Sequence, residues 1–245
     1  MSDFISSIRE RYEKVLDTIA AAARKVGRTP ESTRLVVVTK LQPPDVIQAA
    51  IEAGAHILGE NYADEAAEKI SVLKPQSAVE WHMIGHVQSR KASLVARHFA
   101  LVHSLDSQRL AQRLNRSAAE LGLTLPVLLE FNVSGEKSKH GWEAADDSMW
   151  PDLLTDVNSI AILPNLKVRG LMTMPPLSTD PEAARIYFRQ LRRLRDFLSK
   201  RVPQVDWSEL SMGTSADFTV AVEEGATLVR IGQAILGPRP EAEDR

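Results

Sequence analysis

The stretch 34-RLVVVTKLQPP-44 decides the fold prediction, because it begins as a buried strand and ends in a lysine that two prolines soon follow. The run from Leu35 to Val38 is continuously apolar, which is typical of a parallel strand covered on both faces. Because strand side chains alternate between two faces, Val36, Val38 and Lys40 share one face. If the valines fill a protein interior, Lys40 points into that interior at its open end.

Short apolar runs alternate with helical patterns along the rest of the chain. Strands are expected over residues 34–40, 56–58, 80–84, 101–103, 125–133, 167–173, 207–210 and 228–231. Helices are expected over residues 4–26, 45–53, 63–73, 88–99, 107–121, 150–160, 181–200 and 215–224. Eight such βα units in 245 residues match the size of a (β/α)8 barrel. No G-x-G-x-x-G turn, typical of an open doubly wound sheet, follows the first strand. We therefore predict an α/β fold, a single (β/α)8 TIM barrel with an extra N-terminal helix.

One domain is predicted over residues 1–245, because no Gly-, Ser- or Pro-rich linker divides the chain. Residues 1–27 form the leading helix and residues 238–245 a polar tail. The composition is 44% hydrophobic and 25% charged, and the formal charge of −2 gives no reason to expect nucleic acid or a membrane surface as partner. The lack of cysteine excludes disulfides and thiolate chemistry and suits a cytoplasmic protein. Neither a secretion signal nor a membrane-spanning run is evident.

The ends of barrel strands are where function is expected, and Lys40 ends the first of them. One interpretation is a lysine whose stem is buried while its amine reaches water. The other is a half-buried amine that loses its charge more readily, because a neutral amine is what Schiff-base chemistry needs.

The last two βα loops predict an anion site. The segment 229-VRIGQAILG-237 runs from a strand through a glycine into a helical turn, which leaves backbone N–H groups without partners. The preceding loop, 211-SMGTSAD-217, adds hydroxyl donors, and phosphate sites in barrels favour the loops after strands seven and eight. Arg230 shares a strand face with Gly232, so it is expected to face the lumen. It would form a buried ion pair with a glutamate or donate to the ring nitrogen of a bound pyridoxal phosphate, PLP.

No metal site is predicted. His82 and His86 are four residues apart, but their strand-and-turn context does not place them on one helical face. No carboxylate or third histidine is evident to complete a ligand set.

Several motifs resemble the pyridoxal phosphate homeostasis protein family, whose members are barrels related to the alanine racemase N-terminal domain. The resemblance runs from about residue 34 to residue 237 and is carried by VVVTK, GENYADE, WHMIGHVQSRK, VHSLDS, EFNVSGEKSKHGW, VRGLMTM, ELSMGTSADF and VRIGQAILG. It implies that Lys40 forms a covalent aldimine with PLP and that Arg230 approaches the pyridine nitrogen. It also implies that the phosphate is held by Ser211, Thr214, Ser215, Gly232 and Gln233. The residues implied to border the ring or its pocket are Asn61 and His82.

Three positions depart from the family pattern. Gln42 stands where a second lysine is common, Thr214 where methionine is usual, and Gln233 where threonine is common. For Gln233 only the backbone donor is therefore expected to reach the phosphate.

The resemblance favours a carrier over an enzyme. Related racemases take a second catalytic base, a tyrosine, from a separate C-terminal domain, whereas this chain has only the polar tail after Gly237. Tyr62 is the one tyrosine near a predicted mouth. We expect a monomer that holds PLP reversibly, maintains intracellular PLP (vitamin B6) supply without turnover, and has apo PLP-dependent enzymes as candidate clients. A PLP-dependent amino-acid racemase of narrow scope is the alternative, and a barrel for another phosphorylated metabolite is a third.

Overall fold

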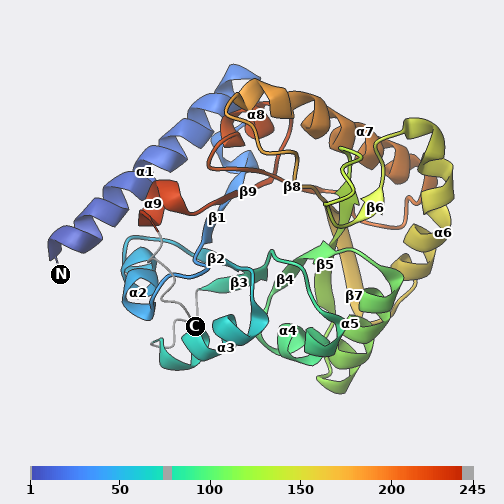
Figure 1. Cartoon of the computed structure of the whole chain (residues 1–245), viewed down its shortest axis with the longest axis horizontal. Coiled ribbons are helices and arrows are strands. Elements are labelled where there is room, and N and C mark those ends of the chain that lie inside the picture. Colours follow the sequence, from blue (N-terminus) through green and yellow to red (C-terminus); the bar gives the residue numbers. More distant parts are fainter. Residues whose placement is uncertain (1, 74–78, 239–245) are drawn as a thin grey trace.

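A closed ring of parallel strands forms the centre of the molecule. The computed structural model describes residues 2–73 and 79–238. The ring consists of β1 (Arg34–Val38), β2 (Ile57–Glu60), β3 (Glu80–Met83), β4 (Leu101–Leu105), β5 (Leu125–Asn132), β7 (Leu166–Met172), β8 (Glu209–Thr214) and β9 (Leu228–Ile231). Each strand pairs in parallel with the next, and β9 pairs with β1 to close the ring (Figure 1). The predicted (β/α)8 barrel is confirmed.

Helices surround this ring on all sides (Figure 1). They are α1 (Ser2–Lys25), α2 (Pro44–Glu52), α3 (Ala63–Val72), α4 (Ala92–His98), α5 (Gln108–Glu120), α6 (Trp150–Ala161), α7 (Arg185–Arg201), α8 (Phe218–Glu223) and α9 (Gln233–Leu236). Four short 3-10 turns accompany them in the described ranges, η1 (Pro30–Ser32), η2 (Ser89–Lys91), η3 (Asp147–Met149) and η4 (Pro181–Ala184). The predicted leading helix is confirmed as α1, which packs against α2, α8 and α9. Because α9 is only four residues long, α1 supplies the cover that a full eighth helix would give.

The apolar core has two parts, one outside the ring and one inside it. The larger part fills the space between the strands and the helices, and it includes Leu35 and Val37. The smaller part lies in the lumen and consists of Val36, Leu101, Leu128, Met172 and Leu228, with Ile57 packed against it. The predicted alternation along the first strand is therefore confirmed, since Val36 belongs to the lumen and its two neighbours to the outer core.

Several strand ends differ from the prediction by one or more residues, and those of β1 and β8 matter most for the mouth. The first strand ends at Val38 instead of Lys40, because the chain turns at Leu41, whose φ is +60°. The strand expected over residues 207–210 begins and ends later, as β8 runs to Thr214. Its unusual residue is the buried Gly213, with φ of +94°, where a Cβ would lie 2.5 Å from the Ala221 Cβ of α8. Glycine thus lets the strand continue through a bulge where the sequence indicated a loop.

A short strand that the sequence did not predict, β6 (Trp142–Glu143), pairs with β5 beyond the ring. The helix expected over residues 88–99 is divided into η2 and α4, and the one over 181–200 into η4 and α7. Of the predicted polar tail only Pro238 lies within the described residues. The described part of the chain contains no helix that is both long and apolar enough to cross a membrane.

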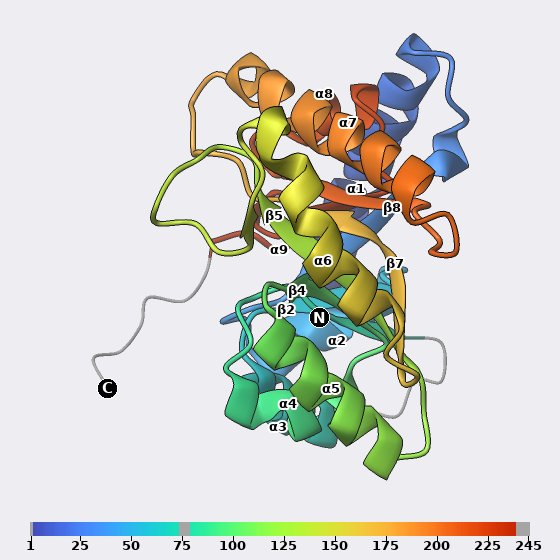
Figure 2. The same ribbon diagram turned by 90° about the vertical axis from the view of Figure 1, so that its right-hand side faces the viewer.

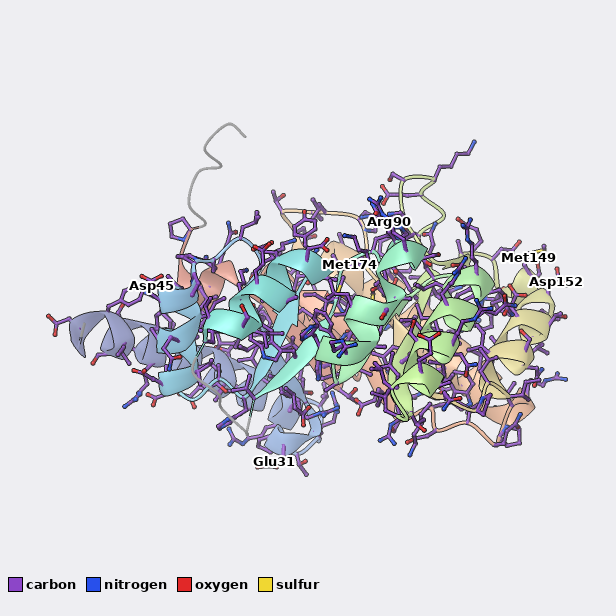
Figure 3. The ribbon with its side chains drawn as sticks, turned by 90° about the horizontal axis from the view of Figure 1, so that it is seen from below. Glu31, Asp45, Arg90, Met149, Asp152 and Met174 are labelled. Carbon is purple, nitrogen blue, oxygen red and sulfur yellow. The ribbon has the colours of Figure 1, made fainter. Side chains whose placement is uncertain are left out.

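The strands share one direction, so their carboxyl ends meet at one mouth. Figure 3 shows the barrel from the side, with Met174 and Arg90 at the mouth and Glu31, which precedes β1, at the opposite end. Two loops project at the mouth, one between β5 and β6 and the other between β7 and α7 (Figure 2).

Candidate functional site

Lys40 lies at the mouth, in the turn that follows β1, and is half-buried. The main chain on both sides of it is held in place. The Thr39 N–H donates to the Gly59 carbonyl at 2.9 Å, and the Leu41 N–H donates to Glu65 Oε1 at 2.9 Å. Behind this turn, on the helix side of the barrel wall, Lys69 donates to the Thr39 carbonyl at 2.9 Å. The main chain beside Lys40 is therefore held by three hydrogen bonds from two neighbouring elements, β2 and α3.

Arg230 lies on β9, extends its side chain into the lumen and is only 4% exposed. Its guanidinium donates to the Ser211 hydroxyl, to the Thr173 carbonyl at 3.0 Å and to Met174 Sδ at 2.9 Å. In the described ranges no carboxylate lies within ion-pairing distance of it, so the predicted alternative of a buried ion pair with a glutamate is wrong for these residues. Burial lowers the pKa of Arg230 to about 10, while Asp217 and Glu130 act to raise it. Arg230 is therefore still charged at neutral pH.

A chain of hydrogen bonds continues from Arg230 through the lumen to the other side of the barrel. Ser211 Oγ and His103 Nδ1 are 2.7 Å apart, and His103 Nε2 and His82 Nδ1 are 3.0 Å apart. His82 Nε2 then lies 3.5 Å from a Glu80 carboxylate oxygen. One assignment satisfies all three hydrogen bonds, with Arg230 donating to Ser211, Ser211 to His103 and His103 to His82.

The two histidines of this hydrogen-bonded series, His82 and His103, are neutral at ordinary pH. Burial, followed by the charge of Arg34, lowers the pKa of His82 to about 3. Burial also holds the pKa of His103 well below its ordinary value, and the neighbouring His82 and Arg230 act in the same direction. The series of hydrogen bonds therefore adds no positive charge to that of Arg230, and its effect is to hold the guanidinium in one orientation. His82 lies at the far end of the series and is not in contact with Arg230.

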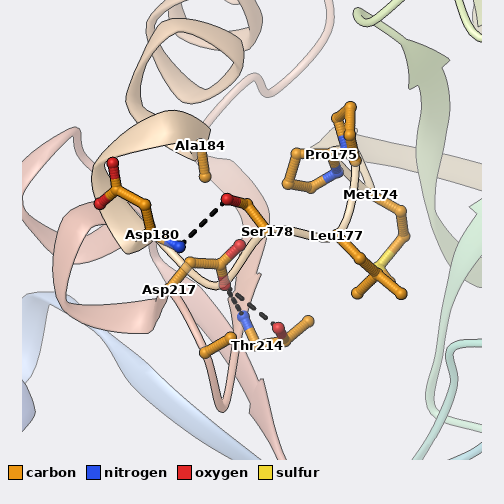
Figure 4. Close-up of a pocket in the computed structure, with 10 residues that line it drawn as sticks. Met174, Pro175, Leu177, Ser178, Asp180, Ala184, Thr214 and Asp217 are labelled. Carbon is orange, nitrogen blue, oxygen red and sulfur yellow. Dashed lines mark hydrogen bonds between the residues drawn. The ribbon is translucent and has the colours of Figure 1, made fainter.

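At the ends of β8 and β9, where the sequence predicts an anion site, some of the expected donors are engaged by the protein itself. The Thr214 N–H and hydroxyl both donate to Asp217 Oδ1, at 2.6 and 3.1 Å (Figure 4). Ser215 is exposed, and Gly232 and Gln233 begin α9. A Cβ at Gly232 would lie 2.9 Å from the Val38 carbonyl oxygen, so the glycine lets the end of β9 approach the end of β1 closely.

Figure 4 shows a small pocket on this side of the mouth, between the loop that follows β7 and the end of β8. Its walls carry apolar and hydroxyl groups together, and they include Met174, Pro175, Leu177, Ser178, Thr214 and Asp217. The loop is stabilised by its own contacts, since the Asp180 N–H donates to the Ser178 hydroxyl at 3.1 Å.

Asn61 follows β2 on the opposite side of the mouth. Its Oδ1 is buried and has no hydrogen-bond partner among the described residues. An unpaired buried acceptor is costly, so such an atom indicates a place where a ligand donor is expected. Asn61 also lines a pocket of about 470 Å³ together with Tyr62, Met83 and His86.

Three residues of the site were not among the predicted ones. His103 and Asp217 complete the hydrogen bonds described above, and Glu130 is buried on β5. Burial raises the pKa of Glu130 to about 7, the nearby Asp106 adds to this effect, and Arg230 opposes it. Glu130 shares its strand face with Leu128 of the lumen cluster. The same alternation that identified Lys40 would therefore have found it.

The raised pKa of Glu130 predicts a pH-dependent stability. Its carboxyl binds a proton more tightly in the folded chain than in the unfolded chain, so its contribution favours folding at low pH and is lost as pH rises through about 7. In Glu130→Gln this loss is absent, so the variant should gain free energy of unfolding relative to wild type between about pH 5 and 8. Urea unfolding of the apoprotein across this range measures the difference. The buried histidines act in the opposite direction, but they are common to both proteins and cancel. The prediction would be contradicted if the free energies of unfolding of wild type and Glu130→Gln differed by the same amount at every pH in this range.

Comparison with known proteins supports one family. The family model for the alanine racemase N-terminal domain matches residues 15–240. The pyridoxal phosphate homeostasis protein of Vibrio alginolyticus is 41% identical over 96% of this chain and 99% of its own length. The corresponding protein of Escherichia coli K12 is 39% identical over 96% of this chain and 98% of its own. Among solved structures, PipY of Synechococcus elongatus PCC7942 with PLP bound superposes with a TM-score of 0.80 at 34% identity, covering 94% of this chain and all of PipY.

Proposed function

Because the chain belongs to the pyridoxal phosphate homeostasis protein family and has the alanine racemase N-terminal fold, we propose that it binds PLP in the mouth of its barrel and maintains the intracellular supply of this cofactor. One observation carries the proposal. The buried guanidinium of Arg230 is held between β7, β8 and β9, while Lys40 lies at the end of the adjacent β1.

The residues at the mouth fit the chemistry of PLP, which supplies an aldehyde that an amine can bind covalently and reversibly. Lys40 is the half-buried amine in this position, and we assign it the Schiff base. The unpaired Asn61 Oδ1 would accept a hydrogen bond from a polar group of the bound cofactor. These two residues lie at the ends of neighbouring strands, β1 and β2, which pair in parallel.

The phosphate would be held at the ends of β8 and β9. The Ser215 hydroxyl and the backbone N–H groups of Gly232 and Gln233 are the candidate donors there. The donors of Thr214 are already engaged by Asp217, so Thr214 would contribute by sharing its hydroxyl or by positioning Asp217. The Ser211 hydroxyl is engaged by Arg230 and His103, and its role in this proposal is to orient Arg230.

The positive charge of Arg230 favours a carrier over an enzyme. A guanidinium keeps its proton, so beside the pyridine nitrogen it would leave that nitrogen unprotonated and weaken the ring as an electron sink. Stabilisation of an amino-acid carbanion would then be poor. Tyr62 does not supply a shielded second base, since it is 54% exposed on the rim. We therefore propose reversible storage of PLP without turnover, with apo PLP-dependent enzymes as recipients.

Two measurements on the purified wild type test this proposal. Protein reconstituted with PLP should show the visible absorbance of lysine-bound cofactor, and a colourless product would overturn PLP binding. In deuterated water the loaded protein should exchange the α-proton of amino acids no faster than an equal concentration of free PLP. Exchange at an enzyme-like rate would replace the carrier with the racemase alternative.

A further inference from the structure

Three side chains that can bind a metal ion converge on the rim of the barrel, and none of the three is assigned to PLP. They are His86, Asp106 and His140, which come from the loops that follow β3, β4 and β5. One ligand atom of each lies within 4.8 Å of the others. His86 Nδ1 is 2.8 Å from Asp106 Oδ2, and the rings of His86 and His140 stack with centroids 4.2 Å apart.

Local structure fixes the side chain of Asp106 and the backbone that carries His140. Asp106 directly follows β4, and its other oxygen, Oδ1, accepts a hydrogen bond from Ser107, which caps α5. The loop that carries His140 is held against β5 by the next residue, Gly141. Its φ is +97°, and a Cβ there would lie 2.4 Å from the Glu130 carbonyl oxygen. The β6 strand, which pairs with β5, begins immediately after this glycine. The convergence therefore comes from the fold and not from the free motion of three surface side chains.

Asp106 supplies the anionic ligand of the cluster, because its carboxylate oxygen lies beside two imidazole nitrogens. The side chain of His86 is 44% exposed, so an ion can arrive from solvent.

We propose that His86, Asp106 and His140 bind one divalent transition-metal ion of the zinc class. Two imidazoles and one carboxylate are ligands that zinc accepts, and three protein ligands leave a fourth position for water. The stacked rings have planes 16° apart, so one ring must turn for both nitrogens to face a shared ion. The sequence prediction of no metal site rested on His82 and His86 alone, with no carboxylate or third histidine evident, whereas the structure brings Asp106 and His140 to His86. The structure separates His82 from His86, because His82 is buried in the barrel wall while His86 lies on the rim.

The test uses the apoprotein, because PLP itself chelates metal ions. Isothermal titration with Zn²⁺ and Ni²⁺ should show one ion bound per chain, and Mg²⁺, which prefers oxygen ligands, should give no comparable heat. His140→Ala, His86→Ala and Asp106→Asn should each weaken binding about tenfold or more. The matched control is His56→Ala, which removes an exposed histidine outside the cluster and should bind as wild type does.

Circular dichroism of each variant should confirm that the proteins compared are folded. Absence of Zn²⁺ and Ni²⁺ binding by the wild type would overturn the proposal. The proposal would also be overturned if His140→Ala bound the metal ion as tightly as wild type does. In that case His140 would only stack on His86 and would not be a ligand. Because no PLP is present, neither result depends on the proposed function.

Discussion

Lys40→Ala is expected to lose the visible absorbance of the PLP-loaded protein entirely, because no other amine would take the place of Lys40 at the end of β1. Reduction of the loaded wild type with borohydride, followed by peptide mass spectrometry, should place the cofactor on the peptide that contains Lys40. The variant should show no labelled peptide. Its fold should be unchanged, since the turn at this position is held by the backbone of Thr39 and Leu41.

Lys139→Ala is the matched control for this experiment. Lys139 is another half-buried lysine at the mouth, on the β5–β6 loop, where its amine lies 3.3 Å from the Pro175 carbonyl oxygen. This variant should keep the absorbance and the labelled Lys40 peptide. If Lys40→Ala retained the band and Lys139→Ala lost it, the assignment of the covalent site would be wrong.

The residues that the sequence identified well are those for which a local rule is sufficient. Strand alternation correctly placed Val36 in the lumen, and it led to Arg230 as a lumen residue. The barrel itself follows from the count of apolar runs alternating with helices, since few other architectures use that rhythm.

The rest depended on how the closed barrel brings distant strands together. His103 and Ser211 are 108 residues apart, and their hydrogen bond exists only because both side chains point into one lumen. Likewise, His86 and His140 become neighbours because β3 and β5 end at the same mouth. Local periodicity contains no information on such pairs.

The second large effect is expected at the buried ion pair behind Lys40. The amine of Lys69 is 2.8 Å from Glu60 Oε1, 2.5 Å from Glu65 Oε1 and 2.9 Å from the Thr39 carbonyl oxygen. Glu60 is fully buried, and among the described residues its Oε2 has no hydrogen-bond partner. Burial raises the pKa of Glu60 although Lys69 and Thr39 act to lower it. The carboxylate therefore depends on Lys69 to remain charged in the folded protein.

Lys69→Met should lower the free energy of unfolding by about 3–5 kcal/mol at neutral pH, because it leaves Glu60 buried without its cation. Urea unfolding measures the loss. The matched control is Lys91→Met, which removes an ion pair with Asp64 at a similar distance, 2.6 Å, but on the surface. That variant should lose only about 0–1 kcal/mol.

A second substitution shows whether the unpaired charge is the cause. In Lys69→Met the pKa of Glu60 should rise further, so the loss should shrink as pH falls and the carboxyl becomes protonated. Adding Glu60→Gln should recover much of the stability at neutral pH for the same reason. Equal losses in Lys69→Met and Lys91→Met, or a loss independent of pH, would contradict this explanation. Because Lys69 also binds the Thr39 carbonyl, the single variant should retain PLP less well than the Lys91→Met control, which would connect the stability of this wall of the barrel to the position of Lys40.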